Sequence, residues 1–223
     1  MNILAHRGLV QGPDRALENR ADTVEAALAI GFGLETDIRF WSSQAYISHD
    51  RLPESPDPSM SALDHVGLWS GSTAPIALNF KEPGTAELLV DFLERTGTAG
   101  RVCVFDMELV EDVPGSTAHR LRELHPGLLL AARASDRQEP LERALALPGE
   151  VVWMDEFEGP WIGQKEIEAV HRAGKQAWMV LPDLHGATRE RMARRLVSFA
   201  DWGADTICTD WALDARQILE SRR

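Results

Sequence analysis

Short apolar runs alternate along the chain with longer segments in which apolar residues recur at helical spacing. Strands that alternate with helices in this way predict an α/β protein with a parallel sheet. Eight main strands are expected, beginning at Ile3, Leu34, Ile76, Val102, Leu128, Val151, Gln176 and Thr206. Helices are expected between most of them, over residues 85–95, 117–124, 139–147, 164–173, 188–202 and 212–222. Eight strand–helix units fit a single (β/α)8 TIM barrel, and a doubly wound sheet is the alternative.

The N-terminal third of the chain predicts two further local features and no domain boundary. A helix is expected to begin at Asp22 or Thr23, either of which can cap it. Residues 46–49 predict a short hairpin arm, and the Pro- and Ser-rich residues 53–61 predict a surface loop. Because no linker, repeat or low-complexity tract divides the chain, residues 1–223 are expected to form one domain.

Composition and charge narrow the class of protein. The chain has 23 Lys and Arg against 35 Asp and Glu, a net charge of -12, which argues against a general nucleic-acid binder. A local phosphate site can still exist within such a field. Cys103 and Cys208 stand in apolar runs and are expected to be buried thiols. We expect no membrane span, because no apolar stretch is long enough, and a cytoplasmic protein, because the N-terminus does not resemble a signal peptide.

Polar side chains concentrate where the predicted strands end, which is where active sites form in a β/α barrel. These side chains are His6, Arg7, Glu35, Asp37, His49, Asp50, Asn79 and Lys81. Glu35 and Asp37 are two positions apart in a strand, so both face the same side. Two adjacent carboxylates repel unless a cation lies between them, and oxygen ligands suit Mg²⁺ or Ca²⁺. Taken singly, the acidic pair is also compatible with a solvated strand face, and each histidine with a structural role.

The order of these residues favours a functional site over the structural alternatives, because it resembles the motif pattern of the glycerophosphodiester phosphodiesterase family. The family pattern runs H-R-G, E-N-T, E-x-D and H-D. It is matched by His6-Arg7-Gly8, Glu18-Asn19-Arg20, Glu35-Thr36-Asp37 and His49-Asp50. Weaker matches follow at Asn79-Phe80-Lys81 and Thr209-Asp210, and residues 153–161 are similar to a bacterial subgroup. The resemblance implies a β/α barrel, in agreement with the strand count.

The resemblance also implies a reaction on a small molecule of lipid metabolism. A glycerophosphodiester-like substrate would be hydrolysed to an alcohol and a phosphomonoester, which is sn-glycerol 3-phosphate for a glycerophosphodiester. His6 and His49 would be the general acid and base, because the histidine pKa lies near working pH. Arg7 and Lys81 would contact phosphate oxygens. Attack by water and attack by an adjacent substrate hydroxyl, through a cyclic phosphate, both remain open, and the sequence favours no particular oligomeric state.

The metal site departs from the family pattern at one position. Glu35 and Asp37 would hold Mg²⁺ or Ca²⁺, and Asn79 stands where the family has a third acidic ligand. An amide oxygen can bind either ion but brings no charge. Asn79 is the first choice as the third ligand, with Asp106 or Asp155 as alternatives. The loss of charge keeps open a catalytically weakened protein that binds a phosphorylated ligand, and a lyase that forms cyclic phosphates from lipid head groups is a further alternative.

Three more residues are expected near the substrate. Glu18 would support Arg7 or lie near the metal. Asp155 is a candidate for the substrate pocket. Trp178 is a candidate as well, with packing in the core as an equal alternative. His185, after Pro182-Asp183-Leu184, is a candidate for a substrate loop. The other histidines are expected to be exposed to solvent, namely His65, His119, His125 and His171.

Overall fold

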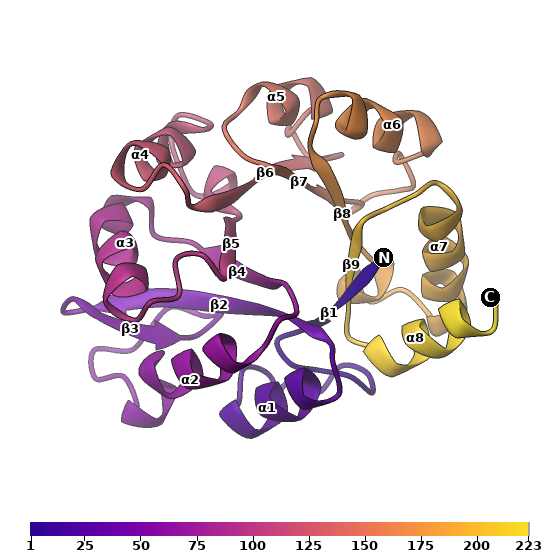
Figure 1. Cartoon of the computed structure of the whole chain (residues 1–223). Helices are drawn as coiled ribbons and strands as arrows, with labels where there is room; N and C mark the ends of the chain where they lie inside the picture. Colours follow the sequence, from indigo (N-terminus) through magenta and orange to yellow (C-terminus); the bar gives the residue numbers. More distant parts are fainter. Residues whose placement is uncertain (223) are drawn as a thin grey trace.

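Eight parallel strands close into a barrel surrounded by helices in the computed structural model, which describes residues 1–222 (Figure 1). The strands are β1 (Asn2–His6), β2 (Gly33–Trp41), β4 (Ile76–Phe80), β5 (Val102–Phe105), β6 (Leu129–Ser135), β7 (Val151–Asp155), β8 (Gln176–Val180) and β9 (Thr206–Thr209). Each pairs in parallel with the next, and β1 lies between β9 and β2, which closes the ring. The predicted (β/α)8 barrel is therefore confirmed, and the doubly wound alternative is wrong.

The helices lie outside the barrel and cover the outer face of the sheet (Figure 1). They are α1 (Ala21–Ala29), α2 (Leu63–Gly71), α3 (Ala86–Arg95), α4 (Ser116–Leu124), α5 (Leu141–Ala146), α6 (Gln164–Arg172), α7 (Arg189–Asp201) and α8 (Ala212–Glu220). Short 3-10 turns are η1 (Pro58–Met60), η2 (Pro83–Thr85), η3 (Met107–Leu109) and η4 (Pro182–His185). Strands buried on both faces need continuous apolar runs, and all five residues of β4 are indeed buried. Within residues 1–222, no helix has the length and apolar character that crossing a bilayer requires.

The interior of the barrel is filled by side chains from alternate strand positions. The cluster includes Phe105 and Trp153, whose rings stack with centroids 4.1 Å apart, and both cysteines, which are buried and unpaired as expected. Trp178 belongs to this cluster, and its indole nitrogen donates to Gln176 at the start of the same strand. Trp178 is thus a core residue, and it is not among the residues that line the pocket described below.

Three local predictions differ from the structure. The helix predicted from Asp22 or Thr23 begins at Ala21, after Arg20, without a side-chain cap, because Asp22 is held by the Arg20 guanidinium. Helix α2 was not predicted, since its two glycines and short apolar stripe give a weak helical signal. That helix buries His65, which was expected to be exposed. The hairpin arm is confirmed as β3 (Gln44–Ile47), which runs antiparallel to β2.

Candidate active site

A pocket of about 510 Å³ opens at the carboxyl ends of the barrel strands, where the polar side chains were expected. Its lining includes eight of the predicted site residues, namely His6, Arg7, Glu18, Glu35, His49, Asn79, Lys81 and Asp155. Asp37 is buried beside them and contacts Arg7 and Lys81. The predicted set is thus gathered at one end of the barrel, with Trp178 as the exception.

His6 stands at the end of β1 between two carboxylates. Its Nδ1 lies 2.7 Å from Asp210 Oδ1, and its Nε2 lies 3.7 Å from Glu35 Oε2. An ionised carboxylate only accepts, so Nδ1 donates to Asp210, and Nε2 is the nitrogen left for chemistry. Burial lowers the pKa of His6, but the hydrogen bond to Asp210 and the nearby Glu35 outweigh it, so the pKa stands above its ordinary value. Asp210 therefore fixes the orientation of the ring.

Arg7 is held by two acidic residues and by its backbone. Its guanidinium donates to Glu18 at 2.5 Å, and its Nε lies 3.2 Å from Asp37 Oδ2. Its backbone has a φ of 50°, in the left-handed region, and its N–H donates to the carbonyl of Glu35 at 2.8 Å. Glu18 takes the position of a support for Arg7, one of its two expected places.

Asn19 connects the loop after β1 to the acidic pair, a connection that the sequence did not indicate. Its amide nitrogen donates to Asp37 at 3.0 Å, and its amide oxygen accepts from Thr36 at 2.8 Å. Its backbone N–H donates to the carbonyl of Arg7, and its own carbonyl lies 3.1 Å from Nε2 of the buried His65. Asn19 has a φ of 60°, which asparagine tolerates better than most residues. It therefore ties the orientation of Asp37 to the position of Arg7.

Glu35 and Asp37 share one face of β2, as predicted, and both are buried. Burial, and then the neighbouring Asp37, raise the pKa of Glu35 to about 7. Burial also raises the pKa of Asp37, but Lys81, whose Nζ is 3.4 Å away, and Arg7 outweigh it and hold that pKa below its ordinary value. The two carboxylates thus have different surroundings, because Arg7 and Lys81 pair with Asp37, whereas Glu35 has only the His6 ring, at 3.7 Å, as an ion-pair partner among the described residues.

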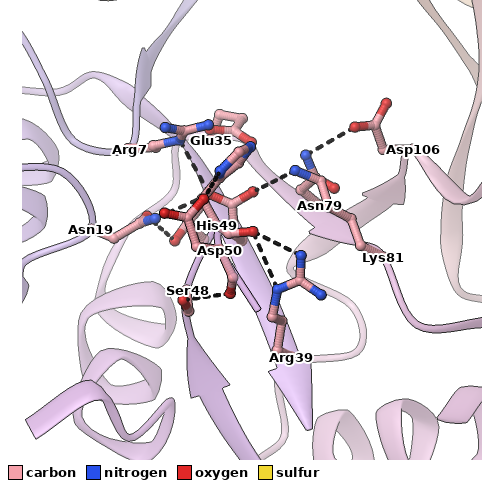
Figure 2. Close-up of polar contacts among 12 residues, drawn as sticks. Arg7, Asn19, Glu35, Arg39, Ser48, His49, Asp50, Asn79, Lys81 and Asp106 are labelled. Carbon is pink, nitrogen blue, oxygen red and sulfur yellow. Dashed lines mark hydrogen bonds and ion pairs between the residues drawn. The ribbon is translucent and has the colours of Figure 1, made fainter. Parts of the chain in front are cut away.

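Two buried oxygen atoms that could bind a divalent cation remain without partners here. Glu35 Oε2 and Asn79 Oδ1 are both buried and make no hydrogen bond to any residue that the structure describes. Asn79 pairs with Asp37 across β2 and β4, and its amide nitrogen donates to Asp106 at 3.0 Å (Figure 2). Within residues 1–222 no three His, Cys, Asp or Glu side chains are grouped for a metal. The donor set that fits is therefore two carboxylates and one amide oxygen, with a charge lower than three acids would give.

His49 has a different environment from His6. It follows β3 on the loop over β2, and its side chain is 40 % exposed. Its Nδ1 lies 2.9 Å from Asp50 Oδ1, and its carbonyl accepts two hydrogen bonds from the Arg39 guanidinium at 3.2 and 2.8 Å. Arg39 in turn donates to Glu82. The backbone of His49 is therefore anchored while its imidazole stays open to solvent at the pocket.

The opposite side of the pocket holds an ionic cluster that the sequence did not predict. Arg133 is buried and donates to Asp106, to Glu139 at 3.2 Å and to Asp155 at 2.8 Å. Asp155 also lies 2.5 Å from Nε2 of His185. Asp155 lines the pocket, but both of its oxygens are engaged by these partners. Nothing in the sequence around Arg133, which stands among alanines in β6, signals that three carboxylates surround it.

Comparisons with known proteins show which solved structures share this fold. No model of a protein family matches the chain, and no curated protein matches it significantly. Solved structures do match. A glycerophosphoryl diester phosphodiesterase from Parabacteroides distasonis is 18 % identical, with a TM-score of 0.67 over 99 % of this chain and 86 % of that one. A glycerophosphodiester phosphodiesterase from Agrobacterium tumefaciens is 17 % identical, with a TM-score of 0.65 over 96 % and 99 %.

A third similar structure is the glycerophosphoryl diester phosphodiesterase domain of a Mycobacterium tuberculosis protein. It is 16 % identical, with a TM-score of 0.62 over 97 % of this chain and 98 % of that one. At such identities the similarity establishes the barrel fold, which is shared by enzymes of many activities. The function of this chain must therefore be argued from its site.

Proposed function

We propose that this chain is a phosphodiesterase that uses a divalent cation and hydrolyses glycerophosphodiester-like small molecules. The observation that carries the proposal is the arrangement around His6. A buried carboxylate, Asp210, orients the ring, and Nε2 is directed to a pocket that also presents Arg7 and Lys81. A titratable base beside cationic side chains suits a phosphate ester. The solved structures that share this fold include three phosphodiesterases, which supports the same reaction class.

The site residues have two roles in the reaction: some transfer protons, and the others bind the phosphate or the cation. One of His6 and His49 takes the proton from the attacking hydroxyl, and the other gives a proton to the leaving alkoxide as the bond from phosphorus to oxygen breaks. Arg7 and Lys81 bind phosphate oxygens. Glu35, Asp37 and Asn79 would hold Mg²⁺ or Ca²⁺, which offsets the negative charge of the phosphate when bound. The products are an alcohol and a phosphomonoester.

The test is turnover by the purified protein. With Mg²⁺ or Ca²⁺ it should hydrolyse a glycerophosphodiester or an activated aryl phosphodiester, and a chelator should abolish the activity. His6→Ala and His49→Ala should each lower kcat by roughly 100-fold or more. His119→Ala is the matched control, because that histidine is exposed on helix α4. Absence of turnover on both substrates would overturn the proposal, and near-wild-type kcat in either variant would remove that histidine from it.

One observation favours a second candidate, a weakly active protein that binds a phosphorylated ligand. The third metal position is the neutral Asn79, so the cation is held with less charge. Binding of glycerol 3-phosphate without turnover of any diester would select this candidate. A cyclic phosphate that persists in phosphorus NMR spectra would instead identify the chain as a lyase.

A further inference from the structure

The side-chain amide of Asn79 has two ends, and only one of them can bind a cation. The oxygen is an acceptor and a metal ligand, whereas the nitrogen carries two N–H donors. The two orientations occupy almost the same volume, so packing alone does not select between them. Asp37, the partner of Asn79 across β2 and β4, is a carboxylate that would accept from the nitrogen. The cation site therefore depends on a contact that turns the nitrogen elsewhere.

Asp106 provides that contact from the side of the amide that faces away from β2. Its Oδ2 lies 3.0 Å from Asn79 Nδ2 (Figure 2). A carboxylate only accepts hydrogen bonds, so the nitrogen end of the amide is the one that faces Asp106. Both residues are buried, and Asn79 Oδ1 has no hydrogen-bond partner among the residues that the structure describes. The contact that binds the amide nitrogen thus leaves the amide oxygen available to a ligand.

The backbone of Asp106 turns its side chain towards Asn79. Phe105, the last residue of β5, pairs with Asn79 of β4 and packs in the barrel interior. Side chains alternate along a strand, so the next residue of a continued strand would point outwards, to the helices. Asp106 instead has a φ of 77° and a ψ of 8°, a left-handed conformation that is uncommon outside glycine. This break in the alternation brings its carboxylate to the amide.

Arg133 fixes the other oxygen of the same carboxylate. Its guanidinium donates to Asp106 Oδ1 and is itself held by Glu139 at 3.2 Å and Asp155 at 2.8 Å. Asp106 therefore has a cation on Oδ1 and the Asn79 amide on Oδ2, in a site with little solvent screening. It could turn to the cation site only by giving up the ion pair with Arg133. These contacts give Asp106 the role of a support and not of a metal ligand.

We propose that Asp106 is a positioning residue for the cation site, which holds the Asn79 amide with its oxygen towards the cation. The inference rests on the proposed function and explains how a neutral third position can still serve Mg²⁺ or Ca²⁺. Hydrogen bonds in series polarise one another, so the bond to Asp106 also makes the amide oxygen more negative. Part of the charge that Asn79 lacks is thus supplied by its neighbour.

Calorimetric titration of the cation-free protein with Ca²⁺ and with Mg²⁺ tests this without turnover. In Asp106→Asn, Arg133 retains an amide oxygen at position 106, so an NH₂ group faces Asn79. Two NH₂ groups cannot bond to each other, and the Asn79 amide should turn over and present its nitrogen to the cation. The Kd for the cation should rise about 10- to 100-fold, the usual effect of removing the support of a metal ligand. An unchanged Kd would overturn the inference.

Two further variants separate the orientation of the amide from the loss of a charge. Glu139→Gln removes an equal charge from the same guanidinium, but Glu139 bonds to Arg133 and Ser135 and not to Asn79, so the Kd should stay close to that of wild type. The double variant Asn79→Asp with Asp106→Asn exchanges acid and amide. Its NH₂ group at position 106 faces a carboxylate with one oxygen left for the cation, so binding should recover. An equal loss in Glu139→Gln, or no recovery in the double variant, would refute the positioning role.

The wild-type protein provides a measurement that does not depend on the folding of Asp106→Asn. The chain has three asparagines, Asn2, Asn19 and Asn79, so labelling with nitrogen-15 asparagine gives three side-chain NH₂ signals in NMR spectra. The signal of Asn79 is the one that disappears in Asn79→Asp. Saturation with Mg²⁺ should shift it, while the bond to Asp106 keeps its hydrogens protected from exchange. An unshifted signal, or a loss of that protection, would contradict the proposed orientation.

These outcomes separate the inference from the proposed function. Cation binding that weakens in Asp106→Asn and recovers in the double variant supports the inference even if the protein hydrolyses no diester. Turnover by a wild-type protein whose Kd for the cation is unaffected by Asp106→Asn leaves the phosphodiesterase function and overturns the inference. A wild-type protein that binds neither Ca²⁺ nor Mg²⁺ overturns the inference as well.

Discussion

The stability of the barrel is expected to depend on Arg133 more than on any exposed cation. Arg133→Met replaces the guanidinium by an uncharged chain, which leaves Asp106 and Glu139 buried without a counter-ion and Asp155 with His185 as its remaining partner. Breaking a buried ionic group by removing one partner costs about 3–5 kcal/mol. Protonating one carboxylate at neutral pH, as an escape, costs about 4 kcal/mol for an ordinary pKa near 4. The two estimates agree, so the variant should lose about 4 kcal/mol of its free energy of unfolding. That is a large share of the usual total of about 5–15 kcal/mol.

The assay is urea unfolding at two pH values. In the variant, protonation of a buried carboxyl removes the uncompensated charge and is easier at lower pH, so the loss is largest near pH 7 and diminishes as the pH falls towards about 5. Arg137→Met is the matched control: that side chain also lies over Phe157, but it is 57 % exposed, and its removal should cost about 1 kcal/mol or less. A loss no larger than in the control, or one that grows at lower pH, would refute the view that Arg133 compensates the buried acids.

Three further predictions concern the site. Asp210→Asn removes the charged partner of His6 and should lower kcat by roughly 10- to 100-fold, whereas Asp201→Asn, on the surface, should not; equal kinetics in both would contradict an orienting role. Asn79→Asp sets a second carboxylate against Asp106, so in chelator it should lower the Tm by several degrees, and added Ca²⁺ should restore more stability than in wild type; a cation-independent Tm would count against the metal site. Burial raises the pKa of Asp183 to about 6, so its ionised form destabilises the fold above that pH, and this cost disappears below about pH 4. Asp183→Asn removes the cost, so its stability relative to wild type should be about 3 kcal/mol greater near pH 7 than near pH 4. Chemical unfolding of both proteins at the two pH values measures this difference.

Most of the fold was predictable because buried parallel strands have an unambiguous pattern. Five of the eight barrel strands begin within one position of Val or Ile in an apolar run, and the helices between them carry one apolar stripe. Helix α2 was missed because its stability comes from what it packs against: Trp69 and His65 are buried by neighbouring elements, while Gly67 lowers its own propensity.

The candidate site was predictable to the extent that it lies along consecutive strands. The spacing of Glu35 and Asp37 alone places both on one face of β2. The contact between His6 and Asp210, in contrast, joins the first and the last strand and exists only because the ring closes. A barrel interpretation could have found it, since an acidic residue at the end of the last strand must lie beside the end of the first. The burial of Arg133 had no such signal, because arginine is rarely found in an interior.

The position of Asp37 between Arg7 and Lys81 would make the binding of the two proposed ligands, the cation and the phosphate, interdependent. In the free protein, the cationic groups that would receive the phosphate already neutralise a carboxylate of their own. A metal ion on Asp37 would release both of them, and an oxyanion on Arg7 and Lys81 would release Asp37. The two binding events are then positively cooperative, and each must raise the affinity of the other by the same factor. Free phosphate should accordingly be a poor inhibitor without the cation and a better one in its presence.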